Sequence, residues 1–204
     1  AENHNHNDIG SYAVALGKCT MVGDQGGPFS YPGDYFSAEA PEKYKIKGSF
    51  GHPVPVVDGK TQSSGAKASA IVLKKEFTDV KDLLCIDYTS AYSTPSLDKL
   101  VRTFVYDRQG KGSFTVGDEF TANAPIRFET AITTQANWKI IDDTHLLLTT
   151  GTEQMTVTIE ASGKVAFTSE TIEVNSPAYT RIGISLKEQS KDGYIRLTMR
   201  TKQL

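Results

Sequence analysis

The sequence predicts an all-β fold, an antiparallel β-sandwich made of many short strands. Three observations support this: apolar and polar residues alternate with a period of two, turn residues recur at short intervals, and no segment after residue 66 keeps a helical period for three turns. Period-two alternation buries one face of a strand and leaves the other in water, which is typical of antiparallel sheets. Many short strands separated by turn signals favour a sandwich.

The expected strands follow one another from residue 66 onward and are rich in β-branched and aromatic residues. They cover residues 68–73, 83–88, 100–106, 113–116, 126–132, 155–160, 165–168 and 194–200. Turn signals separate them at Asp58-Gly59, residues 108–112, Ser162-Gly163 and Asp192-Gly193. Residues 99–106 and 112–120, joined by the Gly-bearing turn, are expected to form a hairpin.

The first 65 residues differ from the rest of this single expected domain, residues 1–204. They hold 10 of the 17 glycines and 5 of the 8 prolines, with two expected strands at 11–16 and 18–22 among long loops. Three of the four histidines also lie in this part of the chain. Because loops on a rigid scaffold usually carry function, residues 1–65 are expected to bear the site and residues 66–204 the regular strands.

Composition excludes several classes of protein. The formal net charge is -2 over 204 residues, so the sequence does not predict nucleic-acid binding. Its longest apolar stretches are too short to span a bilayer, so no membrane span is expected. The polar start without Met suggests a cut site within a longer protein. Cys19 and Cys85 are too few for a disulfide framework, although a bond between them stays open, and Cys85 is expected to be a buried free thiol.

Four residues of the first part form a candidate metal site. His4 and His6 are two residues apart, so on an extended chain both imidazoles point to the same side. Asp24 lies in a Gly-rich turn and His52 in a Pro-rich loop. Two or three histidines with one carboxylate suit Zn²⁺ or another divalent ion. Spacing alone leaves a second interpretation open, in which these are ordinary polar turn and terminal residues.

Three motifs in this part of the chain resemble those of heparinase II/III-type polysaccharide lyases. Residues 3–11 (NHNHNDIGS) are similar to the family's His-x-His-x-Asp-x-Gly-Ser signature, and residues 22–24 to its metal-aspartate turn. Residues 52–62 (HPVPVVDGKTQ) are similar to its His-x-Val-Pro-x-x-x-Gly-x-x-Gln element. The resemblance continues, in the same order, through residues 88–92, 100–108 and 116–120.

The resemblance implies a fold, an activity and a location. The chain would be the C-terminal β-sandwich of a longer lyase whose N-terminal domain is an α-helical toroid. That lyase would cleave acidic polysaccharides containing uronic acids by β-elimination, in the periplasm or outside the cell. Since the helical domain supplies the family's principal catalytic tyrosine, the isolated chain is expected to be inactive. The alternative function is a non-catalytic carbohydrate-binding sandwich with a structural metal ion.

The resemblance also implies roles for individual residues. His4 matches the family's catalytic histidine beside the uronate. The metal ligands are matched by His6, Asp24 and His52, and the ion is zinc or another divalent cation such as Ca²⁺, in a structural role. A tyrosine shortly after the metal aspartate often lies in the cleft. Tyr35 is the first choice for it by spacing and Tyr31 the second.

Overall fold

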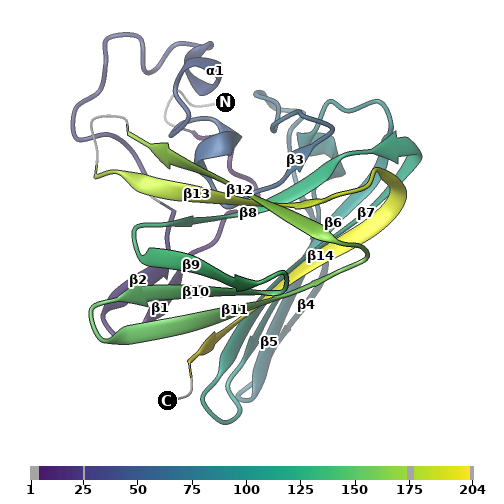
Figure 1. Cartoon of the computed structure of the whole chain (residues 1–204). Coiled ribbons are helices and arrows are strands. Elements are labelled where there is room, and N and C mark those ends of the chain that lie inside the picture. The colour runs from purple at the N-terminus through teal and green to yellow at the C-terminus, as the bar shows by residue number, and fades with distance from the viewer. Residues whose placement is uncertain (1–4, 25, 174–176, 203–204) are drawn as a thin grey trace.

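The computed structural model describes residues 5–24, 26–173 and 177–202. It confirms the predicted antiparallel β-sandwich, in which a four-stranded sheet lies over a larger eight-stranded sheet (Figure 1). The larger sheet has the order β4 (Ile71–Phe77), β5 (Lys81–Asp87), β6 (Leu97–Asp107), β7 (Ser113–Ile126), β14 (Ser190–Thr201), β11 (Glu153–Ala161), β10 (His145–Thr150) and β9 (Asn137–Asp142). The predicted hairpin is the antiparallel pair β6–β7.

The smaller sheet has the order β12 (Val165–Ile172), β13 (Tyr179–Leu186), β8 (Phe128–Thr134) and β3 (Val56–Val57). A separate hairpin joins β1 (Val14–Leu16) to β2 (Cys19–Val22). Helical structure in the described part of the chain consists of short turns: α1 (Ala40–Lys43) and the 3₁₀ turns η1 (Ser49–Gly51) and η2 (Thr89–Ala91). No helix among the described residues is long and apolar enough to cross a membrane.

The main core lies between the two sheets. Phe120 on β7 and Phe128 on β8 are both buried and stack with ring centroids 4.7 Å apart. On β14, Ile195, Leu197 and Met199 are buried, while the residues between them are more exposed. Each such side chain contributes roughly 1.5–3 kcal/mol when it leaves water, so the strand register is fixed by its apolar face.

Two details of the strand prediction were wrong. Asp192-Gly193 is not a turn but lies inside β14, next to an irregularity in the register between β14 and β7. Gly193 is needed there because an added Cβ would lie 2.7 Å from the hydroxyl of Ser162. Strand β13 was not among the predicted strands, although Ile182, Ile184 and Leu186 alternate with polar or small residues; it is covered on both faces and nearly all its residues are buried.

The edge strand β4 is exposed along its whole length, although its first half is strongly apolar. Its neighbour β5 carries Cys85, which is half-buried rather than buried and accepts a hydrogen bond from the Thr103 hydroxyl at 3.5 Å. Cys85 and Cys19 are both free thiols. The chain therefore has no disulfide between them.

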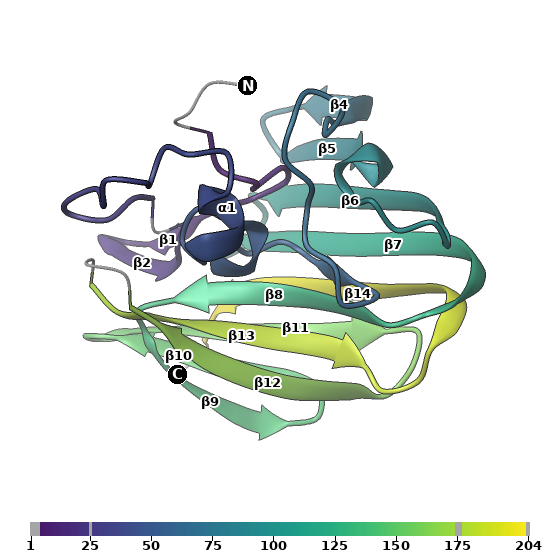
Figure 2. The same cartoon turned by 90° about the horizontal axis from the view of Figure 1, so that it is seen from above.

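A layer of loops and short helical turns, residues 29–55, covers the outer face of the smaller sheet. A second small core holds it there and consists of Tyr35 and Ile46 from the loops with Ile172 and Tyr179 from β12 and β13. The Tyr179 hydroxyl also donates a hydrogen bond to the carbonyl of Gly51 at 3.0 Å. Seen from above, α1 and the neighbouring loops lie beside β1, β2 and β8 (Figure 2). This layer carries part of the candidate site.

Candidate functional site

His52 follows η1 and is completely buried. Its Nδ1 lies 2.8 Å from Oδ1 of Asp24, and its Nε2 is buried without a hydrogen-bond partner among the described residues. Because a carboxylate beside Nδ1 favours the tautomer with the proton there, Nε2 presents a lone pair. A buried polar atom with no partner is uncommon in folded proteins and calls for an explanation. A bound metal ion would explain it.

His6 and Asp8 supply further donors beside His52. One ligand atom from each of His6, Asp8 and His52 lies within 4.8 Å of the others, and the two imidazole rings are 5.2 Å apart between centroids. Nitrogen and carboxylate donors in such a group suit Zn²⁺ and similar ions. The structure thus brings together three of the residues singled out in the sequence, His6, Asp24 and His52, and adds Asp8.

Asp8 was not among the predicted ligands, although the sequence holds a signal for it. On an extended chain, side chains two residues apart point to the same side. The spacing that places His4 and His6 on one side therefore places Asp8 there as well. Burial raises the pKa of the Asp8 carboxyl. Burial, followed by the charge of His52, lowers the pKa of His6. A bound cation would favour the ionised carboxylate and the neutral imidazole.

Asp24 is held in its ionised form. Burial opposes its ionisation, but the hydrogen bond and charge of His52, together with a hydrogen bond from Ser11, outweigh burial and lower the pKa of Asp24 to about 2. The Ser11 hydroxyl donates to Oδ2 at 2.5 Å, leaving Oδ1 for His52. Asp24 therefore fixes the orientation of His52, whether or not it also contacts an ion.

The three predicted catalytic residues lie in different surroundings. The side chain of Tyr35 is buried, and its hydroxyl lies 3.4 Å from Nε2 of His6. Tyr31 is 56% exposed and packs against Tyr35 with ring centroids 5.1 Å apart. His4 lies outside the described residues. Burial, followed by the neighbouring Tyr31, raises the pKa of Tyr35, so its phenol stays neutral at physiological pH.

Gln62 fastens the segment that carries His6 and Asp8 to the loop that carries His52. Its side chain accepts a hydrogen bond from the Ile9 backbone N–H at 2.9 Å and donates one to the Ile9 carbonyl at 2.8 Å. The Gln62 backbone N–H donates to the Ser49 hydroxyl at 2.9 Å. Gln62, the glutamine of the motif at residues 52–62, thus pairs with the backbone of Ile9 as a neighbouring β-strand would.

Gly51 allows the chain to pack closely just before His52. A Cβ on Gly51 would lie 2.1 Å from the carbonyl oxygen of Lys45, so only glycine fits. Nearby, Lys47 is almost fully buried, and its Nζ donates to the carbonyl of Tyr35 at 2.6 Å and lies 4.9 Å from the centre of that ring. This packing fixes the positions of both Tyr35 and His52.

A cavity of about 530 Å³ adjoins the histidine cluster. His6 and Asp8 line it together with Asn5, Asn7 and Gln62. Amide side chains can donate and accept hydrogen bonds at once, and sugar hydroxyls require both. The lining is polar, although the amides of Gln62 and Asn7 already bond within the chain, to Ile9 and to Gln62 and Ser64 respectively.

Solved structures with this fold include heparinases. The chain is similar to a heparinase III structure with a TM-score of 0.75 at 17% sequence identity, over 98% of this chain and 31% of that one. It is equally similar to the heparan sulfate lyase HepC from Pedobacter heparinus, with a TM-score of 0.75 at 15% identity over 98% of this chain and 31% of that one. No protein-family model matches the sequence, and no curated protein does.

These matches confirm that the chain has the fold expected from the resemblance, a β domain of the heparinase II/III type. The chain spans about a third of the length of the solved structures it matches. At these identities the likeness establishes the fold, and the roles of the site residues stay predictions.

Proposed function

We propose that this chain is the β domain of a polysaccharide lyase that cleaves acidic glycans containing uronic acids by β-elimination. The observation that carries the proposal is the contact of His6 with Tyr35 and His52 where His6 itself lines a polar cavity, in a fold that occurs in heparinase III. The motifs at residues 3–11 and 52–62 support it from the sequence.

The proposed lyase holds a divalent metal ion at the cluster. His6 and the free Nε2 of His52 are its nitrogen ligands, and Asp8, Asp24 or both supply oxygen. Two imidazoles favour zinc over Ca²⁺, which prefers six to eight oxygen ligands. The ion's role is structural: it would tie the His6 segment to the His52 loop.

The proposed chemistry removes the C5 proton of a uronic acid and expels the oxygen linked to C4. The C5–H electron pair forms the C4–C5 double bond, the C4–O bond breaks, and the leaving oxygen takes up a proton. A base must lie within hydrogen-bond reach of C5, and developing charge on the carboxylate needs stabilisation. We assign His4 to the uronate side, and a neutral phenol of Tyr35 or Tyr31 can donate a proton.

We further propose that the active site is shared with an N-terminal α-helical domain, and that the protein acts in the periplasm or outside the cell. On this proposal the isolated chain binds metal but does not turn over glycans. Metal analysis of the purified chain, together with the ultraviolet absorbance of unsaturated uronate products, tests both parts. A chain without metal would contradict the first part, and turnover by the chain alone would contradict the second.

One observation favours the second candidate, a non-catalytic glycan-binding sandwich. Phe29 and Tyr31 expose 79% and 56% of their surface on the loop beside Tyr35, as rings that stack on sugars do. Calorimetric titration of the chain with uronate oligosaccharides tests it. Binding that Tyr31→Ala weakens, with no loss in the Phe77→Ala control on β4, would favour this candidate. Absence of binding would favour the lyase domain.

A further inference from the structure

Arg102 lies inside the sandwich on β6 and is completely buried. Its Nε and Nη2 donate to the two carboxylate oxygens of Asp118 on β7, at 2.7 and 2.8 Å. This is the bidentate arrangement that the planar guanidinium favours. Buried ion pairs contribute little net stability compared with apolar residues of similar size, so stability alone does not explain this pair.

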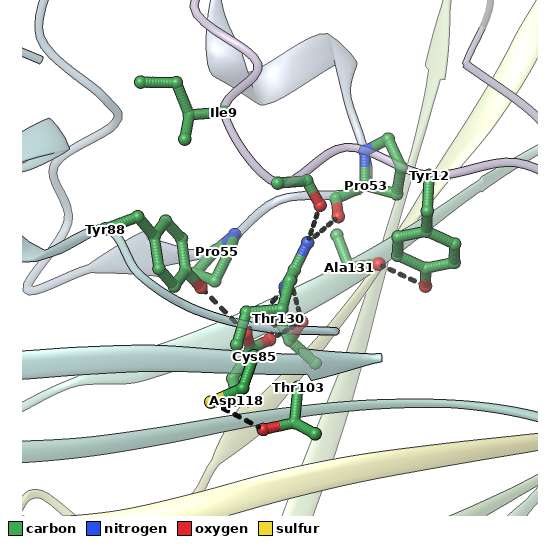
Figure 3. A network of polar contacts seen from close by, with 12 residues as sticks. Ile9, Tyr12, Pro53, Pro55, Cys85, Tyr88, Thr103, Asp118, Thr130 and Ala131 are labelled. Carbon is green, nitrogen blue, oxygen red and sulfur yellow. Dashed lines mark hydrogen bonds and ion pairs between the residues drawn. The ribbon is translucent and has the colours of Figure 1, made fainter. Parts of the chain in front are cut away.

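The remaining nitrogen of Arg102 reaches the candidate site. Its Nη1 donates to the carbonyl of Gly10 at 2.6 Å and to the carbonyl of Pro53 at 2.8 Å. Gly10 comes two residues after Asp8, and Pro53 follows His52 directly. One nitrogen atom therefore joins the two segments that carry the metal-ligand candidates. Figure 3 shows Pro53 on the loop side of this network and Tyr88, Thr130 and Asp118 on the sheet side.

The sheet side of the network is fully bonded. The Tyr88 hydroxyl donates to Oδ1 of Asp118 at 2.7 Å, and the Thr130 hydroxyl donates to Oδ2 at 2.7 Å. The loop side fits just as closely, since Gly10 has a φ of +84° and an added Cβ would lie 3.4 Å from Cδ of Arg102. The guanidinium is thus fixed at both ends.

We propose that Arg102 is a positioning residue, which sets the distance between the Asp8 segment and the His52 loop and so preorganises the metal site. The metal-binding part of this inference rests on the proposed function, whereas the holding of the two segments does not. Lysine cannot replace arginine in this role, because its single ammonium group cannot bind both oxygens of Asp118 and both carbonyls in one plane.

Two variants separate positioning from stability. Asp118→Asn removes the carboxylate charge and leaves Arg102 able to donate to Gly10 and Pro53. The double variant R102M/D118N also lacks the ion pair, keeps an amide oxygen to accept from one of the Tyr88 and Thr130 hydroxyls and an amide N–H to donate to the other, and loses the donors to both loops. It contains no unpaired buried charge, so it is expected to melt at the same temperature as D118N or higher. A purely structural role predicts that metal affinity follows the melting temperature.

We measure zinc affinity by competition with a chromogenic chelator, and amide hydrogen exchange for residues 5–12 and 51–57. The double variant is expected to bind zinc about 10- to 100-fold more weakly than D118N, as losses of supporting contacts do, and to exchange faster in both segments. Equal affinity and equal exchange in the two variants would overturn the proposal. If the wild-type chain binds no zinc, the proposed metal site fails, and the exchange comparison still decides the positioning role.

If R102M/D118N does not fold, Arg102→Lys answers the same question with the same measurements. It keeps a positive charge beside Asp118 but cannot hold both loops. Faster exchange in residues 5–12 and 51–57 at an unchanged melting temperature would support positioning. Wild-type exchange in both segments would count against it.

Discussion

Asp24 and His52 are joined through Oδ1 and Nδ1 at 2.8 Å, and the opposite nitrogen of the same imidazole has no partner among the described residues. The carboxylate thereby decides which nitrogen carries the proton and which presents a lone pair. A buried imidazole with one nitrogen bonded and the other free has the form of a prepared metal ligand.

His52→Asn tests this arrangement. The asparagine amide can still donate to Asp24 from the position of Nδ1, but it has no atom at the position of Nε2. We expect zinc, measured by elemental analysis, to fall from one equivalent per chain to none. His145→Asn is the matched control, because His145 Nδ1 also faces a carboxylate, Asp142 at 3.0 Å, at an exposed site. Equal zinc in both variants would remove His52 from the ligand set.

The two carboxylates beside His52 are expected to contribute differently. Asp8→Asn removes an oxygen ligand candidate of the cluster, whereas Asp24→Asn disturbs His52 through its Nδ1. We expect both variants to weaken zinc binding, D24N by about 10- to 100-fold through loss of orientation. The absorption spectrum of the Co²⁺-substituted chain should change more in D8N. An unchanged spectrum in D8N would exclude Asp8 as a metal ligand. It would favour the ligand set implied by the resemblance, His6, Asp24 and His52.

Gly51→Ala should disturb the site without changing any polar group. The added methyl would meet the Lys45 carbonyl at 2.1 Å, a backbone atom that cannot move alone. We expect a loss of about 1–3 kcal/mol in unfolding free energy and weaker zinc binding, because His52 follows directly. Gly33→Ala is the control, since nothing lies within 4 Å of its Cβ position. Equal stability of the two variants in urea would show that the loop can adjust.

Alkaline pH should reveal the buried phenols around Arg102. Burial raises the pKa values of Tyr12, Tyr88 and Tyr92 above the ordinary value of 10, and that of Tyr179 in the loop layer likewise. A folded-state pKa above the unfolded one gives stability that is present below pH 10 and lost as pH rises through the folded value. We therefore expect no more than five of the nine tyrosines to ionise before the chain unfolds.

Ultraviolet absorbance of tyrosinate, followed beside circular dichroism, measures this count. The chain in guanidinium provides the reference, in which all phenols ionise near their ordinary pKa. Reversible ionisation of all nine with the circular dichroism unchanged would contradict the burial of these four side chains.

Much of the fold was predictable from the sequence at strands that alternate between a buried and a wet face, although β9 and β10 were not among the expected strands. Strand β14 alternates in this way, and its register follows from Ile195, Leu197 and Met199. Strand β13 was missed although Ile182, Ile184 and Leu186 alternate with smaller residues; the burial of its second face under the loop layer is a tertiary feature that the local pattern does not show. The strand predicted at residues 68–73 exists, but its bounds are shifted, because the structure has β4 at residues 71–77.

The site was predictable in part. The sequence motifs named His6, Asp24 and His52, which the structure brings together, but their roles stay predictions. Arg102 and Asp118 were readable as a buried pair: each takes an inward position in its strand, between Leu100 and Phe104 in one and between Val116 and Phe120 in the other. The loop contacts of Arg102 were not readable, because Gly10 and Pro53 are 92 and 49 residues away in sequence.

The link from Arg102 to the N-terminal loops has a consequence for the order of folding. Synthesis proceeds from the N-terminus, so the carbonyls of Gly10 and Pro53 emerge long before their donor on β6 and before Asp118 fixes it. We expect the site segments to dock last, onto a finished β6–β7 hairpin. Pulse-labelled hydrogen exchange during refolding should protect residues 100–120 before residues 7–11. Simultaneous protection would show that the site helps to nucleate the fold.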